Sequence, residues 1–156
     1  MKITVETKVD APIDEVWRAW NNPYDIKQWN AASDDWHTSE ATVDLRVGGR
    51  FSSRMEAKDG SVGFDFAGTY TRVVEHQLVE CSFGERVLLV EFSSGSDGVT
   101  VRETFDAETA HPVEQQRSGW QAILNRFAKY VEGKGKVRET KSKPSRITSM
   151  RSFILF

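Results

Sequence analysis

The feature that most constrains the fold is an unbroken series of strand-length segments in the middle of the chain. Apolar and polar residues alternate there in short runs, and the runs end at turn residues such as Val47-Gly48-Gly49 and Lys58-Asp59-Gly60. Short connections of this kind join antiparallel neighbours. The pattern predicts a meandering antiparallel sheet with six strands, near residues 36–45, 49–57, 61–74, 78–84, 86–93 and 98–106.

Helical periodicity flanks these strands on both sides. After one further strand at Lys2 to Val9, the spacing predicts a short helix that ends near Asn21 and another at Tyr24 to Trp29. A long helix is expected from near Pro112 to about Glu132, and Gly133-Lys134-Gly135-Lys136 is expected to break it. Its apolar stripe consists of Trp120, Ile123, Leu124, Phe127 and Val131.

One long helix is the element available to cover one face of such a sheet. The expected class is therefore α+β, with the order β-α-α-β6-α and a curved sheet wrapped on the C-terminal helix. The space between a curled sheet and its helix is a candidate cavity.

Length and cysteine content bound the organisation of the chain. With 156 residues, we expect one core. The single cysteine, Cys81, excludes an internal disulfide, and no apolar stretch approaches the roughly 20 residues of a membrane helix. The expected location is therefore the cytoplasm, with no membrane span.

Charge divides the chain into two parts. Residues 1–132 hold 14 basic and 22 acidic residues, whereas residues 133–156 hold 7 basic residues and one acidic residue. An acidic domain repels nucleic acid, so we expect the folded part to bind none. Residues 133–156 are expected to form a basic, flexible tail, with a docked extra strand as the alternative. The tail ends in the apolar run Phe153-Ile154-Leu155-Phe156, which is available to contact the domain or a partner.

Several motifs, in this order, resemble a known family. They are Val16-Trp17-Arg18-Ala19-Trp20, Val43-Asp44-Leu45-Arg46-Val47-Gly48-Gly49-Arg50-Phe51, Phe64-Asp65-Phe66-Ala67-Gly68-Thr69-Tyr70, Glu103-Thr104-Phe105-Asp106 and Arg117-Ser118-Gly119-Trp120-Gln121-Ala122-Ile123-Leu124. The chain is similar to small bacterial proteins related to the activator of heat-shock-chaperone ATPase, within the START-like (SRPBCC) superfamily of polyketide cyclases and lipid-transfer proteins.

The resemblance covers about residues 1–132 and implies a helix-grip fold whose cavity holds an apolar or aromatic small molecule. The eukaryotic co-chaperones of this family have an additional N-terminal chaperone-binding domain, for which this sequence is too short. Activation of a chaperone ATPase is therefore not implied.

Strand alternation and the resemblance together predict which residues line the cavity. Inward-facing positions on the strands are joined by residues of the helices. The predicted ligand-binding set is Trp17, Phe51, Ser53, Met55, Phe64, Phe66, Tyr70, Cys81, Phe83, Glu103, Trp120, Leu124 and Phe127. The alternative is that these residues form an ordinary core.

Glu103 is the most informative polar residue, because it shares a face with Val101 and Phe105. A carboxylate on an apolar face either finds a partner or has its pKa raised by desolvation. One interpretation is an ion pair with Arg54, Arg72 or another arginine, or a bulge that turns Glu103 outward. The other is a catalytic acid or base, with Tyr70 as an orienting hydrogen-bond donor.

Three functions remain open at this point. The first is a binding module for a small apolar or aromatic molecule, and the second is an enzyme of cyclase, hydrolase or dehydratase type that uses Glu103. The third is an interaction protein that contacts a chaperone or another partner. No cofactor is expected, and no metal site, because His37, His76 and His111 lie far apart in the sequence. Both a monomer and a homodimer fit the sequence.

Overall fold

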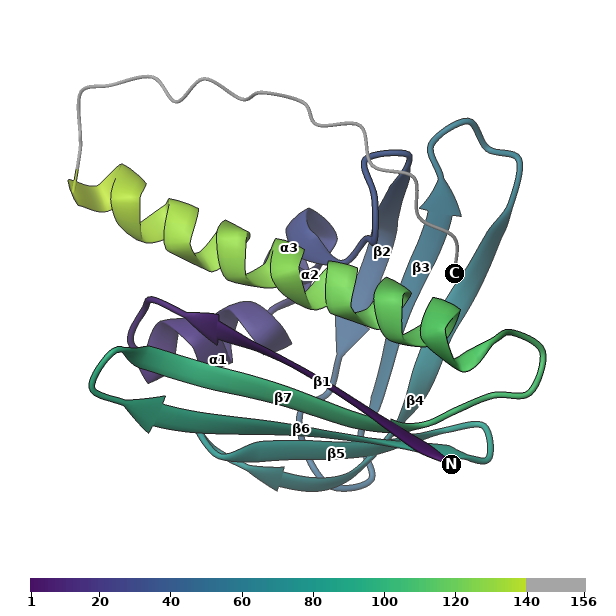
Figure 1. Ribbon diagram of the computed structural model, residues 1–156, viewed down its shortest axis with the longest axis horizontal. Helices are drawn as coiled ribbons and strands as arrows, with labels where there is room; N and C mark the ends of the chain where they lie inside the picture. The colour runs from purple at the N-terminus through teal and green to yellow at the C-terminus, as the bar shows by residue number, and fades with distance from the viewer. Residues whose placement is uncertain (140–156) are drawn as a thin grey trace.

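The computed structural model describes residues 1–139, and its elements follow the predicted order (Figure 1). Every strand boundary lies within two residues of its predicted position. The elements are β1 (Lys2–Val9), α1 (Ile13–Asn21), α2 (Pro23–Trp29), β2 (Trp36–Val43), β3 (Arg50–Ala57), β4 (Gly63–Val74), β5 (Leu78–Phe83), β6 (Arg86–Gly95), β7 (Gly98–Asp106) and α3 (Val113–Glu139).

The seven strands form one antiparallel sheet in the order β1-β7-β6-β5-β4-β3-β2. Strands β2 to β7 lie beside their neighbours in sequence, because short turns connect them. β1 pairs along its whole length with β7, from Lys2 opposite Asp106 to Val9 opposite Val99. Within residues 1–139, the two edges of the sheet are therefore β1 and β2.

β4 bends the sheet. Its first half, up to Thr69, pairs with β3, and its second half pairs with β5. A register shift between Tyr70 and Arg72 marks an irregularity of the kind that bends and twists a strand. Gly68 lies at this bend, where an added Cβ would collide with the Ser82 carbonyl oxygen. As a result, β2, β3 and β4 stand steeply over β5, β6 and β7 (Figure 1).

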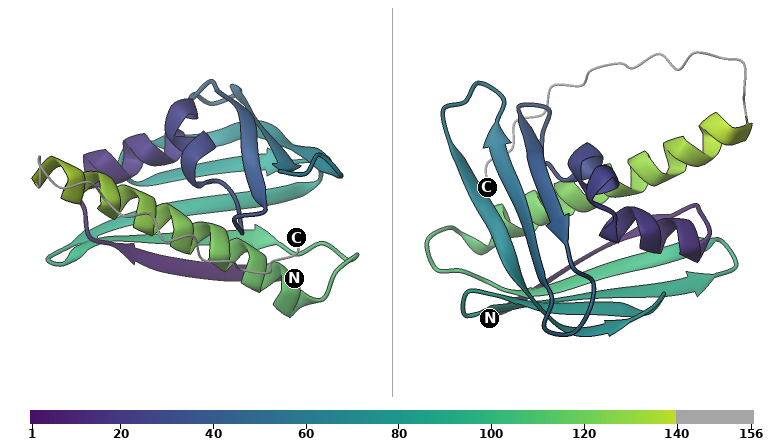
Figure 2. Two further views of the ribbon diagram at one scale, coloured as in Figure 1. Left: turned by 90° about the horizontal axis from the view of Figure 1, so that it is seen from above. Right: turned by 180° about the vertical axis from the view of Figure 1, so that it is seen from behind.

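Helix α3 runs across the concave side of the sheet, and α1 and α2 lie beside its C-terminal half (Figure 2). This arrangement is the predicted helix-grip fold. Its core lies between α1, α3 and the β1-β7-β6-β5 side of the sheet, where Ile3, Phe105, Leu124 and Phe127 are fully buried. Within residues 1–139, no member of the buried core cluster comes from β2 or β3.

The prediction that α3 ends near Glu132 was wrong, because the helix continues to Glu139 through both glycines. A tertiary contact accounts for the difference. The Tyr130 hydroxyl donates to the buried Asp25 carboxylate at 2.5 Å, and the Lys134 ammonium donates to the same oxygen at 2.9 Å. This anchor on α2 offsets the cost of about 1 kcal/mol for each helical glycine. The helix thus crosses the predicted boundary at residue 133, and the remainder of the predicted tail, residues 140–156, lies outside the described residues.

Candidate functional site

A cavity of about 670 Å³ lies between the inner face of the sheet and helix α3. It is lined by all three helices and by every strand from β2 to β7. Its exposed lining residues are Thr42 near the end of β2, together with Phe64, Asp65 and His111, and they mark where it meets solvent. Phe64 and Asp65 lie at the start of β4, and His111 lies just before α3.

Ten of the thirteen residues predicted to line this cavity do so, namely Phe51, Ser53, Met55, Phe64, Phe66, Tyr70, Cys81, Phe83, Glu103 and Trp120. Strand alternation explains their placement, since every second side chain of a strand points to the same face. The register then brings residues from different strands together, with Ser53 opposite Phe66 and Tyr70 opposite Cys81.

Aromatic rings form a continuous wall on one side of the cavity. The Phe51 ring centroid lies 5.2 Å from that of Tyr70 and 5.6 Å from that of Phe66. The Phe66 centroid lies 5.2 Å from Phe83 and 6.0 Å from Trp120. These separations are those of favourable aromatic pairs. Strands β3, β4 and β5 are thereby joined to α3 through stiff side chains.

A second aromatic wall comes from α1 and α2 and was not included in the predicted site. Trp20 and Trp29 both line the cavity, and their rings stack at 4.9 Å with an interplanar angle of 28°. The indole of Trp29 also donates a hydrogen bond to the Ala19 carbonyl oxygen at 2.9 Å, which fixes its orientation. The sequence feature that could have identified these two residues is the helical spacing of the tryptophans. That spacing alone does not show which side of a helix meets a cavity.

Three predicted lining residues lie elsewhere, in the solid core. Trp17 packs edge-on against Phe92, with centroids 5.3 Å apart. Leu124 and Phe127 are fully buried, and Phe127 contacts the rings of both Trp20 and Trp29. The reason is the position of α3 across the sheet, since its residues up to Ile123 line the cavity and the following turns pack against other elements.

Glu103 lies on the inner face of β7, between Val5 of β1 and Val90 of β6 in register. It is only 4% exposed and lines the cavity. Among residues 1–139, no side chain or backbone group forms a hydrogen bond or ion pair with its carboxyl group. Burial raises the pKa of Glu103 to about 8.

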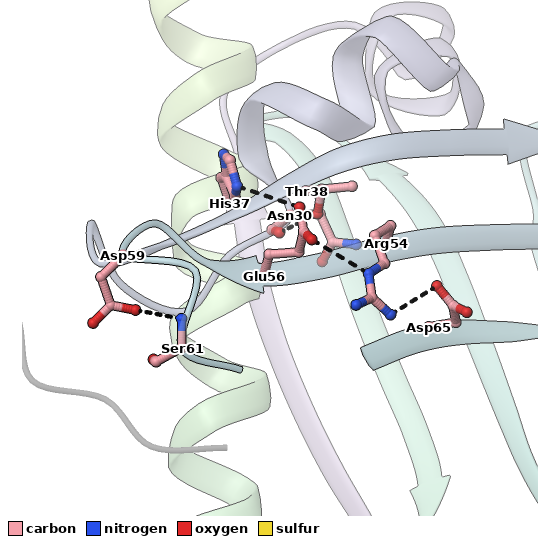
Figure 3. A network of polar contacts seen from close by, with 8 residues as sticks. All are labelled: Asn30, His37, Thr38, Arg54, Glu56, Asp59, Ser61 and Asp65. Atoms are coloured by element: carbon pink, nitrogen blue, oxygen red, sulfur yellow. Dashed lines mark hydrogen bonds and ion pairs between the residues drawn. The ribbon is translucent and has the colours of Figure 1, made fainter. Parts of the chain in front are cut away.

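The predicted ion pair of Glu103 with Arg54 or Arg72 is therefore wrong, and so is the outward turn. Arg54 lies on the outer face of the sheet, between Glu56 and Asp65 (Figure 3). Arg72 faces Glu80 at 4.0 Å. Both arginines form ion pairs with acidic residues on their own side of the sheet.

Two further polar groups of the cavity are neutral. Burial raises the pKa of the Cys81 thiol to about 12, with smaller contributions from Glu103 and Glu80. A thiol with so high a pKa is not an activated nucleophile. Burial likewise raises the pKa of Tyr70 above its ordinary value. In the described part of the chain, nothing hydrogen-bonds to the Tyr70 hydroxyl, so it can bind a polar group in the cavity.

The other charged lining residues already have partners. Asp65 pairs with Arg54 at 3.5 Å, and Glu108 pairs with His111 at 2.8 Å. The Arg86 guanidinium donates to the Asp106 carbonyl oxygen at 2.9 Å and lies 4.6 Å above the Phe83 ring. Among the acidic and basic lining residues of the described chain, Glu103 is thus the one that has no partner.

Residues 1–139 contain no group of three or more histidine, cysteine or acidic side chains able to hold a metal ion. Over the same residues, no helix combines the length and the apolar character needed to cross a membrane.

Comparison with known proteins places the chain in a family. Residues 10–132 match the family model described as Activator of Hsp90 ATPase homolog 1-like protein. No curated protein matches the chain.

Solved structures agree with the family model. The solution structure of the AHSA1-like protein from Aeromonas hydrophila is 51% identical, with a TM-score of 0.82, and the match covers 86% of this chain and 94% of that one. A protein from Cytophaga hutchinsonii is 45% identical, with a TM-score of 0.74 and the same coverage. A protein from Nitrosomonas europaea shares the fold at 18% identity, with a TM-score of 0.77, over 87% of this chain and 97% of that one. The chain therefore belongs to the Activator of Hsp90 ATPase homolog 1-like family, within the SRPBCC superfamily.

Proposed function

We propose that the domain binds a small, mainly apolar or aromatic molecule in the cavity between the sheet and α3. The observation that carries this proposal is the cavity itself, whose volume of about 670 Å³ falls within the usual range of small-molecule sites. Aromatic rings on two walls offer flat, rigid apolar surface to a ligand. The fold also supports ligand binding, because α3 covers the sheet without filling the space between helix and sheet.

Two neighbouring serines of β3 allow a matched test. Ser53 is buried and lines the cavity, whereas Ser52 points to the opposite face of the same strand. Ser53→Trp places an indole in the cavity, and Ser52→Trp places the same group outside it. Circular dichroism establishes that both variants fold, and Ser53→Phe serves as a smaller replacement.

The readout is native mass spectrometry of the protein from its own host, followed by thermal shift with a three-ring arene, a flavone, a sterol and a medium-chain fatty acid. A ligand at about 100 times its Kd is expected to raise the melting temperature of the native protein and of Ser52→Trp by about 5 to 10 °C. Ser53→Trp is expected to show no shift. An equal response of the two variants, or no bound mass and no shift in the native protein, contradicts the proposal.

A second candidate function is acid or base catalysis of cyclase, hydrolase or dehydratase type. The observation that favours it is Glu103, an unpartnered carboxyl group in the cavity with a pKa near neutrality. Tyr70 supplies a hydroxyl group in the same cavity that orients a substrate. The same mass spectra distinguish catalysis from simple binding, because an enzyme changes the mass of its bound compound and Glu103→Gln binds that compound without changing it.

A chaperone contact also remains a proposal, and no contact in the described chain favours it.

A further inference from the structure

Glu103 differs from every other charged residue that lines the cavity. Asp65, Arg86, Glu108 and His111 all have partners within the domain. Glu103 has none among residues 1–139, although it is 4% exposed. A buried polar group without a partner costs stability, so a ligand that provides a partner gains binding energy.

The groups around Glu103 do not include a counter-ion. Its register neighbours on β1 and β6 are valines. Helix α3 contributes no charged side chain to the lining, only Gln115, Gln116, Gly119, Trp120 and Ile123. The titratable lining groups from β4 and β5 are Asp65, which pairs with Arg54, and Tyr70 and Cys81, whose pKa values are both raised by burial. Helices α1 and α2 contribute Trp20, Asn21, Ile26 and Trp29, which do not titrate.

A carboxyl group in these surroundings stays protonated at neutral pH, since burial raises the pKa of Glu103 to about 8. In that form it offers one O–H donor to the cavity. The partner that fits a neutral donor in an apolar site is a neutral acceptor, because a cation would itself have to be desolvated.

From this geometry, and resting on the proposed function, we infer that the ligand carries a hydrogen-bond-accepting oxygen, such as a ketone or amide carbonyl, that docks on the Glu103 carboxyl group. Its apolar body lies between the two aromatic walls. The chemical class is therefore an aromatic or polycyclic carbonyl compound rather than a plain hydrocarbon or an amine.

Three probes of nearly equal shape test this inference. They are 2-acetylanthracene, which has the carbonyl group, 2-ethylanthracene, which lacks it, and 1-(anthracen-2-yl)ethylamine, which is a cation. Their Kd values are measured by fluorescence from pH 6 to pH 9.5, for the native chain and for Glu103→Gln, Glu103→Leu and Glu91→Gln. Glu91 lies on the outer face of β6 and serves as the matched control.

At pH 6 the native chain is expected to bind the ketone about tenfold more tightly than the hydrocarbon, as one hydrogen bond allows. This preference is lost above pH 8, when the donor ionises. Glu103→Gln keeps the preference without its pH dependence, because an amide still donates, and Glu103→Leu loses it. Glu91→Gln behaves as the native chain.

Equal binding of ketone and hydrocarbon overturns the inference and leaves the proposed function standing. Tightest binding of the amine, increasing with pH and lost in Glu103→Gln, also overturns the inference, because the site then takes cations. If none of the probes binds and none competes with a co-purified compound, the proposed function fails, and the inference fails with it.

Discussion

Glu103 is an ionisable residue buried in the sheet, where water does not solvate its charge. The carboxyl group is buried between two valines in register, and its pKa rises from 4.5 to about 8. The folded protein therefore binds a proton at neutral pH that the unfolded chain releases. Folding and protonation of this residue are linked.

The sign of this linkage gives the first prediction. Because folding raises the pKa of Glu103, the favourable contribution of its proton is complete below pH 4.5 and is lost as the pH rises to about 8. Glu103→Gln does not ionise, so its free energy of unfolding relative to the native chain should increase over that interval. We expect a gain of about 2 to 3 kcal/mol between pH 5 and pH 7.5.

Urea unfolding at each pH measures this difference, and Glu91→Gln provides the baseline. A difference between Glu103→Gln and the native chain that stays constant with pH would show that Glu103 is ionised, and paired, in the folded state.

Strand alternation, together with the family resemblance, predicted most of the strand contribution to the site, because a side-chain period of two assigns each residue to a face. The same alternation excludes the predicted ion pair, since Arg54 falls between the inward Ser53 and Met55 and so points outward. Trp20 and Trp29 were harder to predict. A helical stripe shows which residues are apolar, but whether they meet solid core or a cavity depends on how the helix packs.

Helix α3 shows how a distant residue determines the length of an element. Local propensity ends the helix at its two glycines, and the anchor that extends it is Asp25, which lies 105 residues before Tyr130. No pattern near the glycines contains this information. Spacing alone correctly predicted Leu124, Phe127 and Val131 as core residues of α3, and it missed Ala128.

The second prediction concerns this anchor. Lys134→Ala removes one of two hydrogen bonds to the buried Asp25 carboxylate. Because the lysine side chain is partly exposed, we expect a loss of about 1 kcal/mol in the free energy of unfolding. Faster amide exchange is expected over residues 132–139. Lys129→Ala, an exposed position on the same helix, should have little effect on either quantity. If both alanine variants behave alike, the anchor does not hold the end of α3.

Over the whole molecule, the two edges of the sheet are supported unequally. Helix α3 packs on β1, and the buried core cluster includes Ile3, Val5 and Val9 from that strand. At the other edge, α2 packs on β2, but β2 contributes only partly buried apolar residues to the core. In the described chain, the β2–β3 side of the sheet thus lacks the dense packing of the β1 side.

The third prediction follows from this asymmetry. In the ligand-free protein, backbone amides of β2 should exchange with solvent about tenfold faster than those of β1, which equals about 1.4 kcal/mol in opening free energy. Both are edge strands, so the comparison isolates the effect of packing beneath them. Hydrogen exchange followed by mass spectrometry measures it. Equal protection of the two strands would mean that the cavity does not weaken the sheet above it.

The pairing of β1 with β7 also sets an order of events during synthesis. β1 is complete at Val9, but its only neighbour in the described sheet begins at Gly98. A ribosome adds about 5 to 20 residues per second, so the first strand waits on the order of 5 to 20 seconds for its partner. Lys2, Glu6 and Lys8 place charge along that strand, which discourages pairing with other nascent chains. In the described sheet, β1 therefore has no strand to pair with until β7 has been made.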